Sequence, residues 1–101
     1  MRKLLFLFFL ISSSYSFSQT TAVDYYESGY KKAEKNNHRG AIADFTRAIQ
    51  LDYTDAKKFS YYHRGYSKFM IGDKRGACSD MKMSSRLGYE YAKKMLKVYC
   101  K

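Results

Sequence analysis

The chain contains no proline, although it is 101 residues long. Proline lacks the backbone N–H that a helix interior needs, and it ends or kinks a helix that contains it. Its absence leaves every apolar segment free to continue as a helix. The sequence also lacks alternating strand patterns, low-complexity tracts and interdomain linkers. We therefore expect one all-helical domain.

Motifs typical of enzymes and metal sites are missing as well. The sequence has no nucleophile elbow, phosphate-binding loop or isolated carboxylate pair. His38 and His63 are its two histidines, and neither stands at metal-ligand spacing from another histidine, a cysteine or an aspartate. The two cysteines, Cys78 and Cys100, do not form a Cys-x-x-Cys redox motif. We expect no enzyme activity, no cofactor and no bound metal.

Acidic residues are scarce, with nine Asp and Glu against 19 Lys and Arg, which gives a formal net charge of +10. One interpretation is that the cations occupy solvated helix faces and keep a small protein soluble. The other is that they attract an anionic partner, such as an acidic peptide, a lipid headgroup or a nucleic acid. We favour the first, because the cations are scattered and no run of five like charges occurs. No specific nucleic-acid partner is expected.

The longest apolar run is short and lies near the N-terminus. It extends over the eight residues from Leu4 to Ile11, after the cations Arg2 and Lys3 and before a polar stretch that reaches residue 18. This order is typical of a secretory signal peptide. The run is far below the roughly 20 residues that a membrane-spanning helix needs. We expect an exported protein, periplasmic or secreted, with no stable membrane span after cleavage.

A repeated stretch organises the rest of the chain. The segment from Arg39 to Asp52 returns, with changes, thirty-six residues later, and this offset pairs Ala41 with Ala77 and Asp44 with Asp80. A fixed period of about 20–50 residues is typical of stacked structural repeats. Helical spacing of apolar residues and turn residues between them predict five helices. Their expected bounds are about Val23–Lys35, His38–Asp52, Ala56–Ile71, 74–87 and Glu90–Tyr99, after a loose lead at residues 19–22.

The local chemistry of the turns supports these bounds. Asn36-Asn37 predicts a turn and an N-cap for the second helix. Gly72 is suited to the left-handed conformation that ends a helix, and Asp73 to the next cap. Thr54 or Asp55 is the expected cap of the third helix.

The repeat resembles the tetratricopeptide repeat, a helical hairpin of about 34 residues with small residues where its two helices touch. The matching positions are Gly29, Ala41, Phe45 and Ala48 in the first copy and Gly65 and Ala77 in the second. The resemblance implies an all-α fold of antiparallel helical hairpins stacked as a short right-handed solenoid. Residues 1–18 would be the signal peptide, about 22–55 and 58–89 the two repeats, and about 90–100 a terminal capping helix.

The resemblance also implies that the first helix of each hairpin lines a concave face. Tyrosine offers a broad apolar surface with a polar tip, which suits a groove that binds peptides. The alternative is that many of these aromatic residues form the core. The residues that would face the groove are Tyr26, Tyr30, Phe59, Tyr62, Tyr66 and Phe69.

Two further contacts are expected from position in the chain. Cys78 lies ten residues before Gly88 and Cys100 twelve residues after it, so the two come level in an antiparallel pair of helices. An oxidising compartment favours a disulfide between them, and the alternative is two buried free thiols. Asp44 and Arg64 carry opposite charges near the contact between neighbouring hairpins, and we expect a salt bridge there.

Two functional hypotheses follow. The first is a non-enzymatic scaffold that binds a protein or peptide segment on the concave aromatic face. The second is a self-associating structural protein, or a cationic protein that contacts an anionic polymer of the cell envelope. Binding that resists salt favours the first hypothesis, and binding lost steeply with salt favours the second.

Export yields the first testable prediction. Ser16 and Ser18 supply the small residues that signal peptidase requires, so we expect cleavage before Gln19. The mature chain would then carry a charge of +8, since Arg2 and Lys3 are lost. Mass analysis of the N-terminus of protein recovered from the envelope checks this. Recovery of the intact residues 1–18 would contradict it and indicate a membrane-tethered protein.

Overall fold

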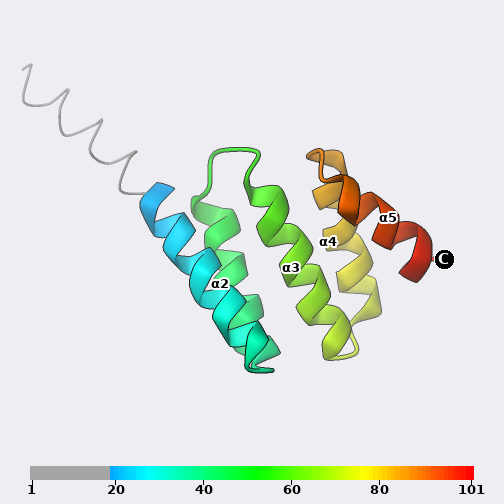
Figure 1. The fold of residues 1–101 in the computed structure, drawn as a ribbon, viewed down its shortest axis with the longest axis horizontal. Helices are drawn as coiled ribbons and strands as arrows, with labels where there is room; N and C mark the ends of the chain where they lie inside the picture. Colours follow the sequence, from blue (N-terminus) through cyan, green and yellow to red (C-terminus); the bar gives the residue numbers. More distant parts are fainter. Residues whose placement is uncertain (1–18) are drawn as a thin grey trace, which may run out of the picture.

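The computed structural model describes residues 19–101, and within this range it contains five helices and no strand. An N-terminal helix at residues 19–34 is followed by α2 (His38–Leu51), α3 (Lys57–Met70), α4 (Lys74–Arg86) and α5 (Glu90–Tyr99). Successive helices run in opposite directions along one row (Figure 1). The predicted all-α stack of antiparallel helical hairpins with a terminal helix is confirmed. The predicted signal peptide lies outside the described residues.

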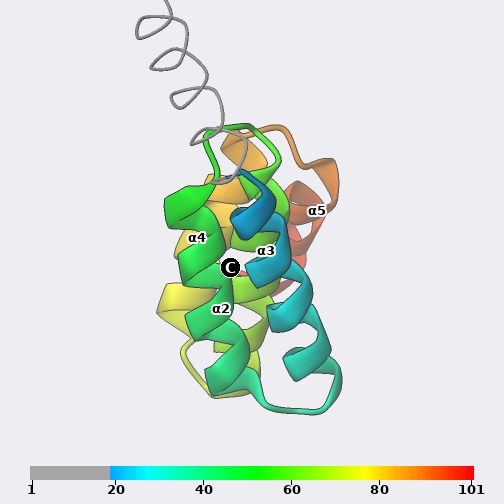
Figure 2. The ribbon, with the colours of Figure 1, turned by 90° about the vertical axis from the view of Figure 1, so that its left-hand side faces the viewer.

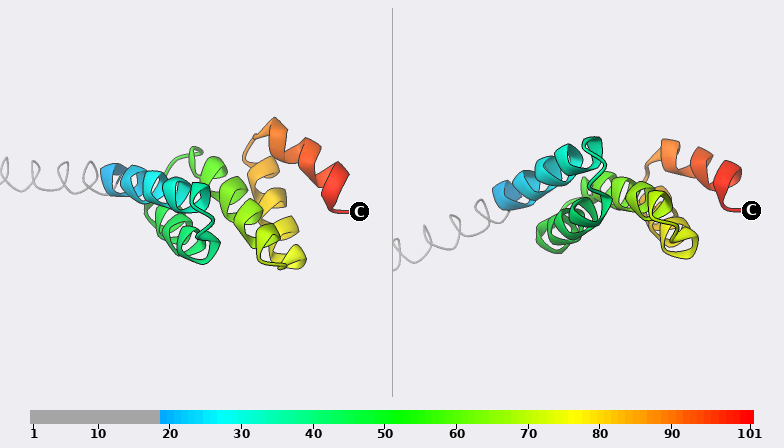
Figure 3. Two further views of the ribbon diagram at one scale, coloured as in Figure 1. Left: turned by 60° about the horizontal axis from the view of Figure 1, so that its bottom comes forward. Right: turned by 90° about the horizontal axis from the view of Figure 1, so that it is seen from below.

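The helices pack in chain order. α3 contacts both α2 and α4, and α4 contacts α5. Seen from the end of the row, the N-terminal helix and α2 lie side by side in front of the second hairpin (Figure 2). Seen from below, the N-terminal helix and α5 lie on one side of the row and α2 on the other (Figure 3, right).

The cap of the second helix in each hairpin repeats with the sequence. Asn37 caps α2, and its side-chain oxygen accepts a hydrogen bond from the backbone N–H of Gly40 at 3.1 Å. Asp73 caps α4, where its carboxylate accepts from the backbone N–H of Gly76 at 2.9 Å. Both predicted caps are confirmed. Each satisfies one of the backbone donors that a helix start leaves without an intrahelical partner.

The residue before each cap adopts a left-handed backbone conformation. Asn36 has a φ of 64° and Gly72 a φ of 90°. These positions are thirty-six residues apart, so the repeat extends to the backbone of the turn. Asparagine and glycine are the residues that tolerate this conformation best, and the turn sequence therefore fixes where each hairpin reverses.

The two helices of each hairpin approach closely at a glycine. A Cβ atom at Gly65 would lie 3.0 Å from the carbonyl oxygen of Ala77, and one at Gly29 would lie 3.0 Å from the Phe45 ring. Ala41 and Ala77 are fully buried beside these contacts. The small residues that suggested the repeat therefore lie where the helices touch.

The core of the second hairpin continues into α5. Tyr62, Met81 and Ala92 form one buried cluster, contributed by α3, α4 and α5 in turn. Burial of an apolar side chain of this size contributes about 1.5–3 kcal/mol. α5 therefore covers the hairpin as the predicted capping helix would.

A disulfide fastens the end of α5 to α4. Cys78, in α4, is bonded to Cys100, the C-cap of α5, with their Cα atoms 5.8 Å apart. This is the pairing expected from the sequence. The bond holds the last turn of α5 against α4, where a terminal helix otherwise frays first.

A buried carboxylate lies between α3 and α4. Asp80 is 3% exposed and receives two hydrogen bonds from the Arg64 guanidinium, both at 2.8 Å. The Lys68 ammonium adds a third contact at 3.1 Å. These bonds to Asp80 raise the pKa of Arg64 above its ordinary value, although burial of the guanidinium opposes the rise. Two cations thus neutralise one buried carboxylate.

The first hairpin has the corresponding carboxylate with weaker partners. Asp44 pairs with the Lys32 ammonium at 3.0 Å and accepts a hydrogen bond from the Ser28 hydroxyl at 2.6 Å. Asp44, Lys32 and Ser28 correspond to Asp80, Lys68 and Arg64 at the thirty-six-residue offset. The repeat therefore keeps the carboxylate and the lysine but replaces the arginine by serine.

The predicted salt bridge between Asp44 and Arg64 is wrong. Arg64 gives both of its carboxylate hydrogen bonds to Asp80, sixteen residues later in its own hairpin. Across the hairpin boundary its guanidinium reaches only the hydroxyl of Thr46, at 3.1 Å. Asp44 is already neutralised by Lys32 within its own hairpin. Each of these two carboxylates therefore has its cationic partner within its own hairpin.

Two local predictions also need correction. Residues 19–22 are helical rather than a loose lead, and Ala22 is 2% exposed because it packs near the loop before α3. Neither Thr54 nor Asp55 is the cap of α3. The N-cap is Ala56, which has no side-chain cap, while the Thr54 hydroxyl accepts from the Ala56 N–H at 3.1 Å.

Asp80 generates a stability prediction. Replacing it with asparagine (Asp80→Asn) leaves Arg64 buried without its counter-charge, and such a loss costs about 3–5 kcal/mol. The matched change Asp44→Asn should cost about 1 kcal/mol or less, because its lysine partner is 42% exposed. Urea unfolding of both variants measures the difference. Equal losses of unfolding free energy in the two variants would contradict the conclusion that Asp80 contributes more to stability than Asp44.

Candidate functional site

The six aromatic residues expected on the concave face do not all line one groove. Tyr26 and Tyr30, on the N-terminal helix, contact the ring of His63 on α3. Tyr62, Tyr66 and Phe69 face α5 instead and line a groove there. Phe59 lies outside this groove and borders a separate hollow together with Tyr26. The structure therefore divides the predicted set between two junctions of the stack.

His63 fills the junction between the N-terminal helix and α3. Its ring centroid lies 5.7 Å from that of Tyr26 and 5.4 Å from that of Tyr30, both edge to face. The ring stacks on Phe45 of α2 at 5.8 Å. Burial lowers the pKa of His63, because the surrounding rings do not solvate an imidazolium. The His63 ring therefore fills the space beside Tyr26 and Tyr30, where the sequence predicted part of a groove.

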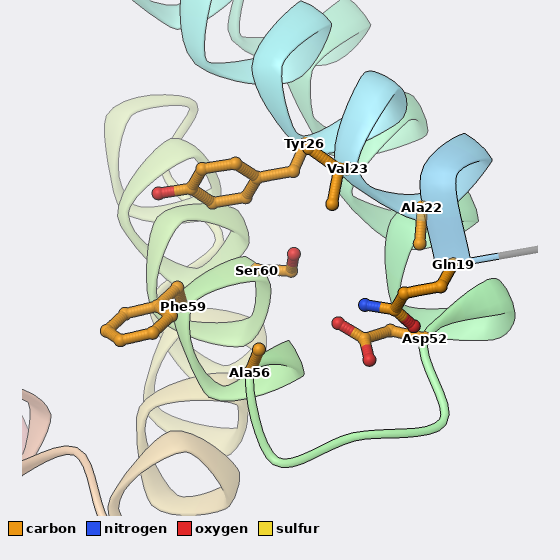
Figure 4. Close-up of a pocket in the computed structure, with 8 residues that line it drawn as sticks. All are labelled: Gln19, Ala22, Val23, Tyr26, Asp52, Ala56, Phe59 and Ser60. Atoms are coloured by element: carbon orange, nitrogen blue, oxygen red, sulfur yellow. The ribbon is translucent and has the colours of Figure 1, made fainter. Parts of the chain in front are cut away.

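Phe59 lies near the loop that joins the two hairpins. Its ring contacts Tyr89 at 5.1 Å, and it borders a hollow of about 130 Å³. Figure 4 shows Tyr26 and Phe59 on one side of this hollow and Gln19 and Asp52 on the other. The hollow is small and lies between the hairpins, and we assign it no ligand.

A larger groove lies between α3 and α5. Its volume is about 310 Å³, which is at the lower end of the range for pockets that bind small ligands. Its lining is aromatic and sulfur-containing, and four of its residues stay about half exposed: Tyr66 46%, Met70 53%, Tyr91 47% and Tyr99 50%. The complete lining is Tyr62, Tyr66, Phe69, Met70, Met81, Tyr91, Met95 and Tyr99. We call this surface the α3–α5 groove.

The floor of the α3–α5 groove is buried and its rim is exposed. Tyr62 is 8% exposed and contacts Tyr89 and Tyr91 edge to face, at 5.4 and 5.3 Å. Burial raises the pKa of Tyr62, and the neighbouring Tyr91 raises it further. Its hydroxyl therefore stays protonated near neutral pH and offers a polar group inside an apolar groove. Tyr62 serves as core and as floor of the site at once.

Five of the eight residues that line the groove were not among those predicted from the sequence. Tyr91, Met95 and Tyr99 follow one another at intervals of four residues, so they form one ridge along α5. This spacing indicates an aromatic ridge, but not which neighbour the ridge faces. The contact between Phe69 and Tyr99, with ring centroids 5.4 Å apart, places the ridge against α3.

Two negative findings concern residues 19–101. In this part of the chain, no three His, Cys, Asp or Glu side chains lie where they could hold a metal ion. No helix in the same range combines the length and the apolar character needed to cross a membrane.

Comparison of the chain with protein-family models, curated proteins and solved structures finds no match.

His63 makes the fold sensitive to pH. Its pKa lies below the ordinary value of about 6.5, so in mild acid the unfolded chain binds a proton that the folded chain does not. Stability should therefore fall as the pH drops from about 7.5 to about 5.5, and the loss should stop below the folded pKa. The variant His63→Phe keeps a ring beside Phe45 but cannot titrate. Melting curves at both pH values should show a smaller drop for this variant than for the wild type, and equal drops would contradict the assignment.

Proposed function

We propose that this chain is an exported, non-enzymatic interaction module of the tetratricopeptide type, which binds a peptide segment of a partner protein in the α3–α5 groove. The observation that carries the proposal is the half-exposed wall of Tyr66, Met70, Tyr91 and Tyr99. Large apolar side chains gathered in one hollow mark binding sites more often than scattered exposed residues do.

The lining indicates what kind of segment fits. Tyrosine provides a rigid apolar face with a polar tip, and methionine adapts its shape to different ligand side chains. The hydroxyl groups of Tyr62 and Tyr91 interact with each other, and the more exposed Tyr91 hydroxyl can also bind the peptide backbone. The segment should therefore carry two or three large apolar side chains rather than a cluster of charges.

Exposed lysines of α5 outside the groove add a preference for acidic flanks. Lys94 lies one turn after Tyr91 on α5, and the outer side of the helix also carries Lys93 and Lys97. All three lysines are exposed. Acidic residues beside the apolar anchors would raise the association rate more than the final affinity.

Two observations support the extracytoplasmic location. The sequence from Arg2 to Ser18 has the order of a secretory signal. The bond between Cys78 and Cys100 is of a kind that persists in oxidising compartments. The tetratricopeptide assignment rests on the repeated small residues and on the stacked hairpins that they close.

Tyr66 offers the sharpest test of the groove. Linear peptides selected from a displayed random library on the purified protein provide the ligand, and a tryptophan in the peptide gives a clean fluorescence signal because the chain has none. Tyr66→Ala should weaken binding about thirty-fold, which corresponds to about 2 kcal/mol for an aromatic anchor. It should leave the fold intact, since Tyr66 is half exposed.

Tyr53→Ala is the control, because Tyr53 is an exposed tyrosine in the loop before α3 and outside the groove. It should bind the selected peptides like the wild type. If Tyr66→Ala also binds normally, the groove is not the site. If the wild type is a dimer that Tyr66→Ala converts to a monomer, a second copy of the chain occupies the groove and the self-association hypothesis replaces this one.

A further inference from the structure

No run of five like charges occurs, but the net positive charge is concentrated in the C-terminal part of the chain. Residues 74–101 contain eight Lys and Arg against two acidic residues, which accounts for six of the ten net positive charges. Residues 19–73 contain nine Lys and Arg against seven acidic residues. The excess therefore belongs to α4 and α5 rather than to the protein surface in general.

The disulfide brings two cationic segments together. Lys74 and Lys82 lie one helical turn before and one after Cys78 on α4, and Arg75 lies on the same side. Lys101 directly follows Cys100. An open hollow of about 390 Å³ surrounds the bond, and its lining is Lys74, Arg75, Cys78, Lys82, Cys100 and Lys101. We call this the cationic hollow.

The two acidic residues of this segment do not neutralise the hollow. Asp80 is buried and pairs with Arg64 and Lys68 on the side of α3. Glu90 is the first residue of α5, about 15 Å along the helix from Cys100. Asp73, beside Lys74, accepts a hydrogen bond from the Gly76 N–H as the cap of α4. In the described residues, no ion pair joins the four cations of the hollow to a carboxylate.

The position of two of these cations is unfavourable for the fold. Lys74 and Arg75 occupy the first turn of α4, which contains no acidic residue. The helix dipole favours negative charge at this end, so cations there destabilise the helix. The disulfide also holds like charges near one another. An anion bound in the hollow would relieve both unfavourable interactions.

We propose that the cationic hollow binds a linear polymer of phosphate groups through its backbone charges. Lys74 and Lys82 are about 12 Å apart along the axis of α4, so they span more than one phosphate. Lysine and arginine both bind phosphate oxygens with charge-assisted hydrogen bonds.

The lining of the hollow separates this ligand from two others. It contains no aromatic ring on which a nucleic-acid base could stack. Apart from the two half-cystines it presents no apolar side chain that could enter a lipid bilayer. The cationic hollow shares no lining residue with the α3–α5 groove, so this proposal is independent of the function proposed for the groove.

The test uses the purified, oxidised protein and fluorescently labelled inorganic polyphosphate. The double variant Lys74→Gln/Arg75→Gln should bind about tenfold more weakly, and the slope of log affinity against log salt should fall by about two. The same variant should be as stable as the wild type or more stable, because it removes cations from the start of a helix. If the two residues had only a structural role, the variant would not lose binding while keeping its stability.

Lys31→Gln/Lys35→Gln is the charge-matched control, since both lysines are exposed, Lys31 in the last turn of the N-terminal helix and Lys35 directly after it. It should change the affinity by less than about twofold. Reduction of the disulfide should weaken binding in the wild type, because Lys101 is then no longer held beside α4.

Three results would overturn the proposal. An equal loss in the control would show that net charge alone attracts the polymer. Unchanged binding after reduction would show that the two segments do not form one site. Binding to vesicles rich in anionic phospholipid, without binding to polyphosphate, would assign the hollow to a membrane surface.

Discussion

The carboxylate of Asp80 lies buried between α3 and α4, where cationic partners must replace the water that it loses on burial. Arg64 and Lys68 are four residues apart, so they lie on one face of α3 and direct that face toward α4. Tyr62 and Tyr66 are each two residues from Arg64, which places them on the opposite side of the helix. One polar contact inside the hairpin thus fixes which aromatic residues face α5 and form the groove.

The repeat distributes stability unevenly between its two copies. In the first hairpin Asp44 is held by one lysine and one hydroxyl, and the helices meet through the Gly29–Phe45 contact. In the second, a bidentate arginine and a disulfide add to the packing. Groove residues must keep their positions before a ligand arrives, because ordering them on binding would cost affinity. Both proposed sites lie in the half of the molecule that is fastened more strongly.

Local chemistry made part of this structure predictable. Asn37 and Asp73 were identifiable as caps, because capping depends on residues within one turn. The proximity of Cys78 and Cys100 was predictable by counting residues along α4 and α5 from Gly88, in the turn between them. The partner of Arg64 was not predictable in this way, because Asp44 and Asp80 occupy equivalent positions in the two repeats. The repeat itself distinguishes them: the contacts Ser28–Asp44 and Arg64–Asp80 are equivalent and both span sixteen residues.

The candidate site was predictable only on the α3 side. Tyr62, Tyr66 and Phe69 were placed by the resemblance of the hairpins to a known repeat, and the structure puts all three in the groove. The opposite wall depends on how α5 is rotated about its axis. That rotation is set by burial of Ala92 and by the disulfide at Cys100, which are contacts between distant segments. Helical spacing indicates that a ridge exists, but only the packing shows what it faces.

The thirty-six-residue offset explains why the groove is open. It relates Tyr62 and Tyr66 to Tyr26 and Tyr30, and it relates Tyr99 to His63. In the first junction the His63 ring packs between its two tyrosines. In the second, Tyr99 packs on Phe69 instead, and a hollow of about 310 Å³ remains beside Tyr62 and Tyr66. The groove is therefore the unfilled counterpart of a packed junction. A ligand side chain that enters it would take the place that the imidazole ring occupies one repeat earlier.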